Sequence, residues 1–266
     1  MQHLININWN FIHFNYRMDY DYRIVAFIDI LGFTNSIQKS ENDREEFQRI
    51  LTCLNGLKDF FISEKDSYEI DAEREYCADT QIVQVSDCII FSRLYQEQGG
   101  IYQMLSDCAF ATHLLISNGF LRRGAIKYGK MYHKGTTLFG KAYIDAYLAE
   151  QNEKLPIIKF SNDIFEIVRQ FPFPVNKPIA EWEVDFVKKN CKMLDTGEYY
   201  IDYFTDYDDL VGEVGLASIH YNKLREIIVK GLNLPNTCSA YEKYLWAAKQ
   251  FNSSTAEIFQ LRKVNI

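Results

Sequence analysis

Two aspartates stand where their neighbours favour metal chemistry. Asp29 ends the apolar run of "RIVAFIDILGFT", and Asp87 interrupts a second apolar stretch, "QIVQVSDCIIFS". A strand end and a neighbouring hairpin tip can point two carboxylates into one cleft. Mg²⁺ is usually held by one or two carboxylates, with water and substrate phosphates as its other ligands. The pair therefore predicts a divalent-cation site. The alternatives are a helix cap at Asp29 and an ordinary turn at Asp87.

The residues that follow Asp29 favour a phosphate ligand. "ILGFT" predicts a turn and a helix start, where free backbone N–H groups can hold the β- and γ-phosphates of a nucleotide. Gly32 suits this turn because a Cβ there would obstruct the approach of a phosphate. The Thr34 hydroxyl is a further donor. Two bound cations would activate an attacking hydroxyl and neutralise a departing pyrophosphate.

Hydrophobic periodicity predicts the elements that position these residues. The expected strands are 23–29, a hairpin over 81–92 with Asp87 near its tip, 120–129, an extended arm over 130–140, 155–161 and 197–204. The expected helices span 32–40, 101–118, 141–153, 162–171, 216–230 and 241–251. A further helix is expected to start at a capping box formed by Asp43 and Glu46. Gly119 and Gly231 are expected to end the helices that precede them. The charged stretch 63–75 and the Pro-marked stretch 172–178 are expected to be loops.

This alternation predicts an α+β protein with helices packed on a mixed sheet. We expect an N-terminal arm over residues 1–21 and a catalytic domain over 22–175. Residues 176–266 are expected to form a C-terminal strand and helical extension packed on the same domain.

Composition limits the possible functions. The 266 residues carry a formal net charge of -7, which argues against broad binding to nucleic acid or to an anionic membrane. No segment is long and apolar enough to span a bilayer, and no signal peptide is recognisable. The six cysteines show no CxxC spacing and are expected to be reduced core residues. A cytoplasmic protein is therefore expected.

"FIDILGFT", "VSDC", "RRGAIKYG" and "LFGKAYIDAYLAE", in that order, resemble the catalytic domain of class III nucleotide cyclases over roughly residues 22–165. The short chain, the last of these motifs and the C-terminal helices look most like bacterial pyrimidine (uridylate or cytidylate) cyclases of the antiphage Pycsar type. "AYLAE" departs slightly from their "AxxLE" pattern. The implied fold is a ferredoxin-like, palm-type sandwich, here with a C-terminal helical appendage.

The resemblance implies a head-to-tail homodimer with active sites at the subunit interface. Each site would convert a nucleoside triphosphate, here UTP or CTP, to a 3′,5′-cyclic nucleotide and pyrophosphate. Asp29 and Asp87 would hold two Mg²⁺ or Mn²⁺ ions, and the Ile30 carbonyl would bind one of them. A separate effector that responds to the cyclic nucleotide would act as partner in antiphage defence. The implied substrate-binding residues are Phe27, Leu31, Gly32, Phe33, Thr34, Val83, Arg123, Thr137 and Lys141.

Base recognition departs from the usual family pattern. Most class III enzymes read a purine with a Lys or Glu four residues before the hairpin aspartate and a second residue three before the glycine that opens the later helix. Val83 and Thr137 occupy these positions. Neither purine code is present, because Val83 has no polar group and Thr137 offers one hydroxyl. This favours a pyrimidine or a relaxed specificity. Phe27 keeps the ring but lacks the hydroxyl of the Tyr that pyrimidine enzymes tend to carry.

The transition-state positions also differ. Ile144 and Leu148 stand where the family places an Asn and an Arg, and loss of such a donor typically costs about a hundredfold or more in rate. The candidates for a compensating cation are Arg122, Arg123, Lys127, Lys130 and Lys141. The rival hypothesis is a non-catalytic nucleotide-binding or dimerisation module with a degenerate cyclase fold. A diguanylate cyclase is disfavoured because its GG(D/E)EF motif is absent.

Overall fold

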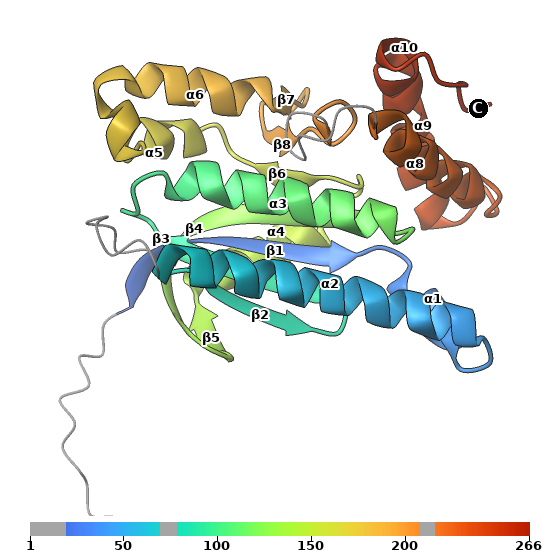
Figure 1. Ribbon diagram of the computed structural model, residues 1–266, viewed down its shortest axis with the longest axis horizontal. Helices are drawn as coiled ribbons and strands as arrows, with labels where there is room; N and C mark the ends of the chain where they lie inside the picture. Colours follow the sequence, from blue (N-terminus) through green and yellow to red (C-terminus); the bar gives the residue numbers. More distant parts are fainter. Residues whose placement is uncertain (1–19, 70–78, 208–215) are drawn as a thin grey trace, which may run out of the picture.

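The computed structural model describes residues 20–69, 79–207 and 216–266, with backbone only for 61–69. The described chain forms a mixed sheet of strands in the order β2-β3-β1-β4-β6-β8-β7, and β5 pairs with β4 beside this path (Figure 1). The strands are β1 (Asp21–Ile30), β2 (Gln81–Val85), β3 (Cys88–Leu94), β4 (Arg122–Lys134), β5 (Thr137–Gly140), β6 (Ile158–Phe160), β7 (Cys191–Met193) and β8 (Tyr199–Ile201).

Helices cover both faces of this sheet. The helices α2 (Arg44–Glu69) and α3 (Gly100–Ser117) lie in front of the sheet in Figure 1, and α4 (Lys141–Gln151) packs on β4 and β1 from behind. The other helical elements are α1 (Phe33–Ser40), α5 (Ile164–Gln170), the 3₁₀ helix η1 (Pro174–Ile179), α6 (Ala180–Lys189), α8 (Ala217–Leu232), α9 (Ser239–Ser253) and α10 (Thr255–Ile258).

The chain order and pairing of the first four sheet strands define a ferredoxin-like unit. The strand β1 is followed by helices, then by the antiparallel hairpin β2–β3, then by α3 and β4. β1 lies between β3 and β4 and is antiparallel to both. This is a βαββαβ arrangement, and it confirms the predicted α+β class.

Alternation along β1 decides which side of the sheet carries the candidate site. Ile24, Ala26 and Ile28 pack in the large core under α2 and α3, whereas Val25 and Phe27 belong to a smaller cluster with residues of α4. Because successive side chains of a strand point to opposite faces, Asp29 shares the α4 face with Val25 and Phe27.

Most predicted elements are present, with two corrections. The hairpin closes on Ser86 and Asp87 as predicted, and Asp43 caps α2 by accepting N–H bonds from Glu45 and Glu46. The predicted loop over 63–75 is wrong for its first part, because α2 continues to Glu69, and residues 70–78 lie outside the described chain. The predicted loop over 172–178 is helical from Pro174, where proline can begin a helix without losing a hydrogen bond.

The C-terminal part does more than pack against the domain. The strand β8, predicted as 197–204, joins β6, and β7 adds a further strand to the same sheet. The helices α8 and α9 share a second core cluster with Tyr203 and Phe204, which follow β8 (Figure 1). The sheet thus continues across the predicted boundary at residues 175–176, which itself remains a prediction. Of the predicted arm over 1–21, residues 1–19 lie outside the described residues, and Asp21 already belongs to β1.

Two other expectations concern membranes and cysteines. Within the described residues, no helix is long and apolar enough to cross a bilayer. Five cysteines are free thiols, at Cys53, Cys88, Cys108, Cys191 and Cys238, and Cys77 lies outside the described residues.

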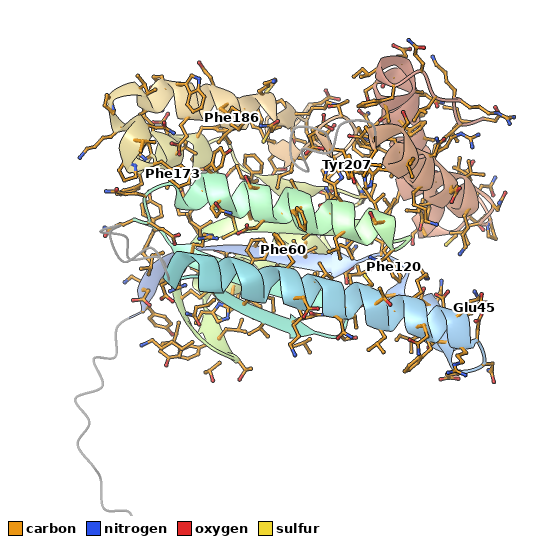
Figure 2. All side chains as sticks on the ribbon, in the orientation of Figure 1. Glu45, Phe60, Phe120, Phe173, Phe186 and Tyr207 are labelled. Carbon is orange, nitrogen blue, oxygen red and sulfur yellow. The ribbon has the colours of Figure 1, made fainter. Side chains whose placement is uncertain are left out.

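A buried histidine pair joins α8 to the domain core. His113 on α3 contacts His220 on α8 through ring nitrogens 3.0 Å apart, and its other nitrogen lies 2.9 Å from an Asp206 carboxylate oxygen. The ring of Tyr207, labelled in Figure 2, stacks on His220 at 4.1 Å. Burial, together with the neighbouring His113, lowers the pKa of His220 from 6.5 to about 3.

We predict that acid weakens the fold through His220. The unfolded chain binds a proton near pH 6.5 and the folded chain only near pH 3, so stability is complete above about pH 6.5 and falls as pH decreases towards 3. His220 is expected to contribute about 1.4 kcal/mol per pH unit to the slope of the free energy of unfolding, measured in urea. The variant His220→Gln should have a clearly shallower slope. An unchanged slope would contradict this role of His220.

Candidate active site

The structure brings the two predicted metal ligands together. The carboxylates of Asp29 and Asp87 and the thiol of Cys88 have ligand atoms within 4.8 Å of one another. The Ile30 N–H donates to the Asp87 carbonyl at 3.1 Å, which ties the end of β1 to the hairpin turn. Ile30 itself is buried, and its carbonyl as a metal ligand remains a prediction.

These donors fit a hard divalent cation. Two carboxylates supply the oxygen ligands that Mg²⁺ and Mn²⁺ prefer. Burial, together with the neighbouring Asp87 carboxylate, raises the pKa of the Cys88 thiol to about 11, so Cys88 remains protonated and is a weak ligand at neutral pH. The cation would therefore be held by Asp29 and Asp87.

A partly buried ion pair supports Asp29 from the adjacent strand. Arg123 lies opposite Asp29 in the β1–β4 register, and its guanidinium is 3.4 Å from the Asp29 carboxylate. The same guanidinium forms an ion pair with Glu150, whose side chain in the last turn of α4 is fully buried. Arg123 thus links the candidate metal ligand to α4.

The electrostatics of the site favour a bound cation. Burial and the Glu150 carboxylate raise the pKa of Asp29 to about 6, with Asp87 adding to the effect, although Arg123 acts in the opposite direction. An elevated carboxyl pKa means that the folded chain has too little positive charge nearby to compensate the carboxylates. A divalent cation would supply that charge.

The turn after Ile30 leaves backbone donors free for an anion. Leu31 donates its N–H to the Leu121 carbonyl at 2.9 Å, so this group is occupied. Gly32 then adopts a φ of 76° and precedes α1 with no side-chain cap, and the first N–H groups of a helix have no partner within it. Gly32 and Thr34 are exposed. The predicted phosphate turn is therefore available from Gly32 onwards.

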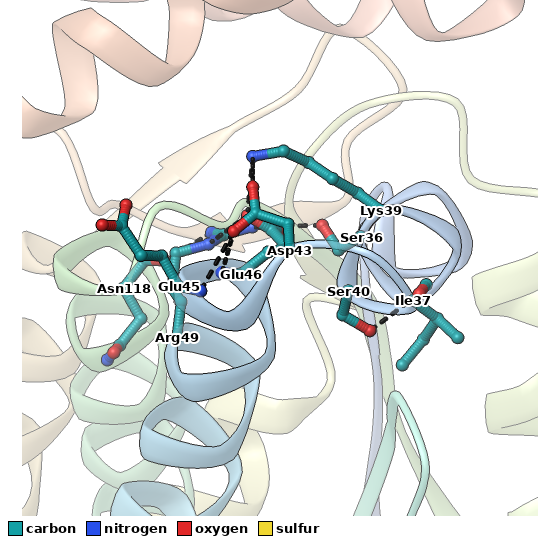
Figure 3. Close-up of polar contacts among 9 residues, drawn as sticks. All are labelled: Ser36, Ile37, Lys39, Ser40, Asp43, Glu45, Glu46, Arg49 and Asn118. Atoms are coloured by element: carbon teal, nitrogen blue, oxygen red, sulfur yellow. Dashed lines mark hydrogen bonds and ion pairs between the residues drawn. The ribbon is translucent and has the colours of Figure 1, made fainter.

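A polar cluster fixes α1 against its neighbours (Figure 3). Arg49 on α2 donates to the Asn118 carbonyl at 2.6 Å and to the Ser36 hydroxyl at 3.1 Å, and it pairs with Glu46. Lys39 lies 3.1 Å from the Asp43 carboxylate. Because Arg49 contacts Ser36 in the middle of α1 and Lys39 in its last turn contacts Asp43, their effect is to hold α1 against α2.

The predicted base-reading and ring positions are not all open to a ligand. Phe27 is 3 % exposed and its ring contacts Tyr143 and Tyr147 of α4, so this side chain is covered by α4 and its contact with substrate remains a prediction. Phe33 is also 3 % exposed and packs on Phe120, labelled in Figure 2, which leaves only its backbone for a phosphate. Both rings belong to the protein core. Phe27 lies on the face of β1 that α4 covers, and Phe33 lies on the buried side of α1.

Val83 and Thr137 lie apart from the carboxylate pair in the sheet. Val83 lines a cavity of about 590 Å³ between β2, α2 and the β4–β5 turn. Thr137 is exposed at the start of β5, and it lies opposite Lys134 in the β4–β5 register. Their roles in base recognition remain predictions.

Only one of the five candidate cations contacts the carboxylate pair. Arg122 is 1 % exposed and donates to the Thr112 hydroxyl and to the Pro156 carbonyl, so this candidate is engaged in the core. Lys141 is exposed and pairs with Asp145 on its own helix. No ion pair to the carboxylate pair is found for Lys127 or Lys130 among the described residues, which leaves Arg123 beside Asp29.

The structure adds two charged residues that the motifs did not predict. Glu150 lies in the predicted helix 141–153, and its burial follows from its position four residues after the buried Ala146. Lys243 comes from α9, more than two hundred residues after Asp29, yet Asp29, Glu150 and Arg123 all act on its charge. No local sequence signal marks this juxtaposition.

Gly124 lets β4 approach β1 at the base of the site. A Cβ at this position would lie 2.6 Å from the Phe27 carbonyl oxygen and 3.3 Å from the Ile158 side chain. We predict that Gly124→Ala destabilises the protein by about 2–3 kcal/mol, measured by urea unfolding. Gly56→Ala on α2 is the matched control, because its Cβ would meet Leu114 at an ordinary 3.6 Å. Equal stability of the two variants would contradict this packing.

Comparisons with known proteins give a distant structural likeness. No protein-family model matches the sequence, and no curated protein matches it. The solved guanylyl cyclase domain of the RhoGC fusion protein from the aquatic fungus Blastocladiella emersonii is similar over 69 % of this chain and 95 % of that chain, with 14 % identity and a TM-score of 0.43.

Two bacterial adenylyl cyclase structures are similar to a comparable degree. The adenylyl cyclase CyaB from P. aeruginosa matches over 68 % of this chain and 94 % of that chain, with 14 % identity and a TM-score of 0.41. A bacterial light-regulated adenylyl cyclase matches over 72 % of this chain and 97 % of that chain, with 12 % identity and a TM-score of 0.40. Because all three TM-scores lie below 0.5, we infer function from the residues of the site itself.

Proposed function

We propose that this protein is a nucleotide cyclase, which converts a nucleoside triphosphate to a 3′,5′-cyclic nucleotide and pyrophosphate. The observation that carries the proposal is the convergence of Asp29 and Asp87 beside the uncapped start of α1. Carboxylates that hold divalent cations next to free helix N–H groups suit a ligand whose phosphates are bound by both.

In this reaction the ribose 3′-hydroxyl attacks the α-phosphorus. A bond forms from O3′ to the α-phosphorus, the bond to the β-phosphate oxygen breaks, and pyrophosphate leaves. Mg²⁺ or Mn²⁺, when bound, would favour loss of the hydroxyl proton and neutralise the leaving group. Asp29 and Asp87 would hold two ions, Arg123 would orient Asp29, and the N–H groups from Gly32 onwards would hold the distal phosphates.

A pyrimidine is the proposed base. Neither Val83 nor Thr137 carries the charged group with which most class III enzymes read a purine. UTP and CTP are therefore the proposed substrates. The cyclic product would serve as a second messenger for a separate effector, and antiphage defence is the role that the sequence resemblance suggests.

A homodimer is proposed for the complete site. The outer face of α4 and the neighbouring β5 expose large apolar side chains next to the candidate site, namely Phe139, Ile144, Tyr147 and Leu148. A contiguous apolar patch of this kind is typical of an interaction surface. A second copy seated there would cover Ile144 and Leu148, the two positions that lack transition-state donors in this chain.

The test is a substrate panel. Purified protein is incubated with Mn²⁺ and ATP, GTP, CTP or UTP, and products are separated by chromatography. We expect cyclic UMP or cyclic CMP, with little product from ATP or GTP. Purine products alone would contradict the proposed base. Binding of a triphosphate without turnover would favour the non-catalytic module, whose supporting observation is the apolar pair Ile144 and Leu148.

A further inference from the structure

We propose that a cavity between α3 and the C-terminal strands binds a small organic ammonium ion, whose charged group meets the carboxylate of Asp206. The cavity measures about 70 Å³ and is lined by residues of α3, α6, β7 and β8, together with Asn190 and Asp206. None of its lining residues belongs to the candidate active site. The inference is therefore independent of the proposed function.

The cavity joins a half-buried side to a buried side. Tyr102 of α3, Phe186 of α6 and Asn190 are half-buried, whereas Asp206 is 4 % exposed. The rings of Tyr102 and Phe186, the second of which is labelled in Figure 2, stack with centroids 5.5 Å apart. One water needs about 10–15 Å³ of such space, so the cavity has room for about five waters or for a ligand with about as many heavy atoms.

Most of the buried lining is apolar. Leu105 and Ala109 come from one side of α3, Val187 from the end of α6 and Ile201 from β8, and all four are buried. Apolar walls favour a ligand that carries a short hydrocarbon body, because its burial removes apolar surface from water.

Asp206 provides a polar group that lacks a donor. One of its carboxylate oxygens lies 2.9 Å from the Nε2 atom of His113, and the other is buried without a hydrogen-bond partner in the described chain. Its ion pair among the described residues is with His113, a side chain that is charged only when protonated. A buried carboxylate oxygen without a donor is costly, so a ligand that brings an N–H group is favoured.

The lining selects an ammonium group over other charged ligands. No Lys or Arg side chain lines the cavity, which disfavours an anion. Asp206 is its one carboxylate, and Mg²⁺ or Ca²⁺ would need more oxygen ligands than apolar walls offer. An alkylammonium ion carries three donors. Asp206 can accept one, and the Ser106 hydroxyl and the Asn190 side-chain oxygen are further acceptors, since the Asn190 amide nitrogen already donates to the Phe186 carbonyl at 3.1 Å.

The position of the cavity gives such a ligand a structural consequence. The helix α3 belongs to the ferredoxin-like unit, whereas α6, β7 and β8 follow it in the chain and lie above α3 in Figure 1. Through Asp206 the ligand would also contact the pair His113 and His220, which joins α3 to α8. A bound amine would therefore tie α3 to the C-terminal part of the protein.

The experiment compares n-propylammonium with n-propanol, which has the same hydrocarbon body and a neutral head group. Each is titrated into the full-length protein at pH 8, and binding is followed by the NMR methyl signals of Leu105, Val187 and Ile201. We expect n-propylammonium to bind about ten- to a hundredfold more tightly than n-propanol, because its hydrogen bond to Asp206 is charge-assisted.

Two variants test the assignment. Asp206→Asn keeps the shape and an acceptor for His113, and it should bring the two affinities within about threefold of each other. Ser106→Leu fills the cavity from α3 while it leaves Asp206 and His113 in contact, and it should weaken binding of both ligands by at least about tenfold. Asp185→Asn is the matched control, because Asp185 is an exposed carboxylate on α6 outside the cavity, and it should bind as the unmodified protein does.

Three results would overturn the inference. The first is equal affinity of the unmodified protein for n-propylammonium and n-propanol, or binding of neither. The second is an unchanged preference for the ammonium ion in a folded Asp206→Asn variant. The third is normal binding of n-propylammonium by Ser106→Leu, which would place the ligand outside this cavity.

Discussion

Asp87→Asn is expected to lower the rate of cyclic-nucleotide formation by at least about a hundredfold, because it removes a carboxylate that positions charge at the reacting phosphates. The side chain keeps its shape, and Asp87 is half-buried at a hairpin tip, so the fold should be unaffected. Product is measured by chromatography with the best substrate of the panel. Mn²⁺ affinity, measured by calorimetry, should fall in parallel.

The matched control for this prediction is Asp145→Asn. Asp145 is also a carboxylate, but it lies on α4 and forms an ion pair with the exposed Lys141 one turn earlier on the same helix. Its replacement should leave both activity and Mn²⁺ affinity within about twofold, because exposed ion pairs contribute little. Activity of Asp87→Asn close to that of the unmodified protein would show that the hairpin aspartate is an ordinary turn residue.

The largest effect on stability is expected from Arg123→Met. This change leaves Glu150, which is fully buried, without its ion-pair partner, and breaking such a pair typically costs about 3–5 kcal/mol. The free energy of unfolding in urea measures the loss. Activity should also fall, because Asp29 loses the guanidinium that lies 3.4 Å from it.

The double variant Arg123→Met with Glu150→Met tests the physical reason. Replacing both charges by apolar side chains removes the unpaired carboxylate, so most of the lost stability should return while activity stays low. A double variant as unstable as Arg123→Met alone would contradict the view that Glu150 is the source of the destabilisation.

The proximity of Asp29 and Asp87 was predictable because its signals are local. Asp29 follows a strand that is recognisable from its apolar residues, and Asp87 sits in a two-residue turn between two short strands. Gly32 precedes α1 as the turn predicted. In each case the chemistry lies within a few residues of the element that positions it, so periodicity and turn residues sufficed.

The remaining features of the site have physical causes that a single sequence does not display. Arg122 and Arg123 are neighbours on β4, and only the pleat of the strand decides that Arg122 enters the core while Arg123 meets Asp29. Phe27 is covered by α4, a contact between residues far apart in the chain. Glu150 and Lys243 likewise reach the site through tertiary packing.

The most direct test of cyclase activity is the stoichiometry of the products. With Mn²⁺ and the preferred nucleoside triphosphate, the unmodified protein should release one pyrophosphate for each 3′,5′-cyclic nucleotide, identified by mass spectrometry and phosphorus NMR. Orthophosphate in place of pyrophosphate, or no product from any of the four triphosphates, would contradict a nucleotide cyclase.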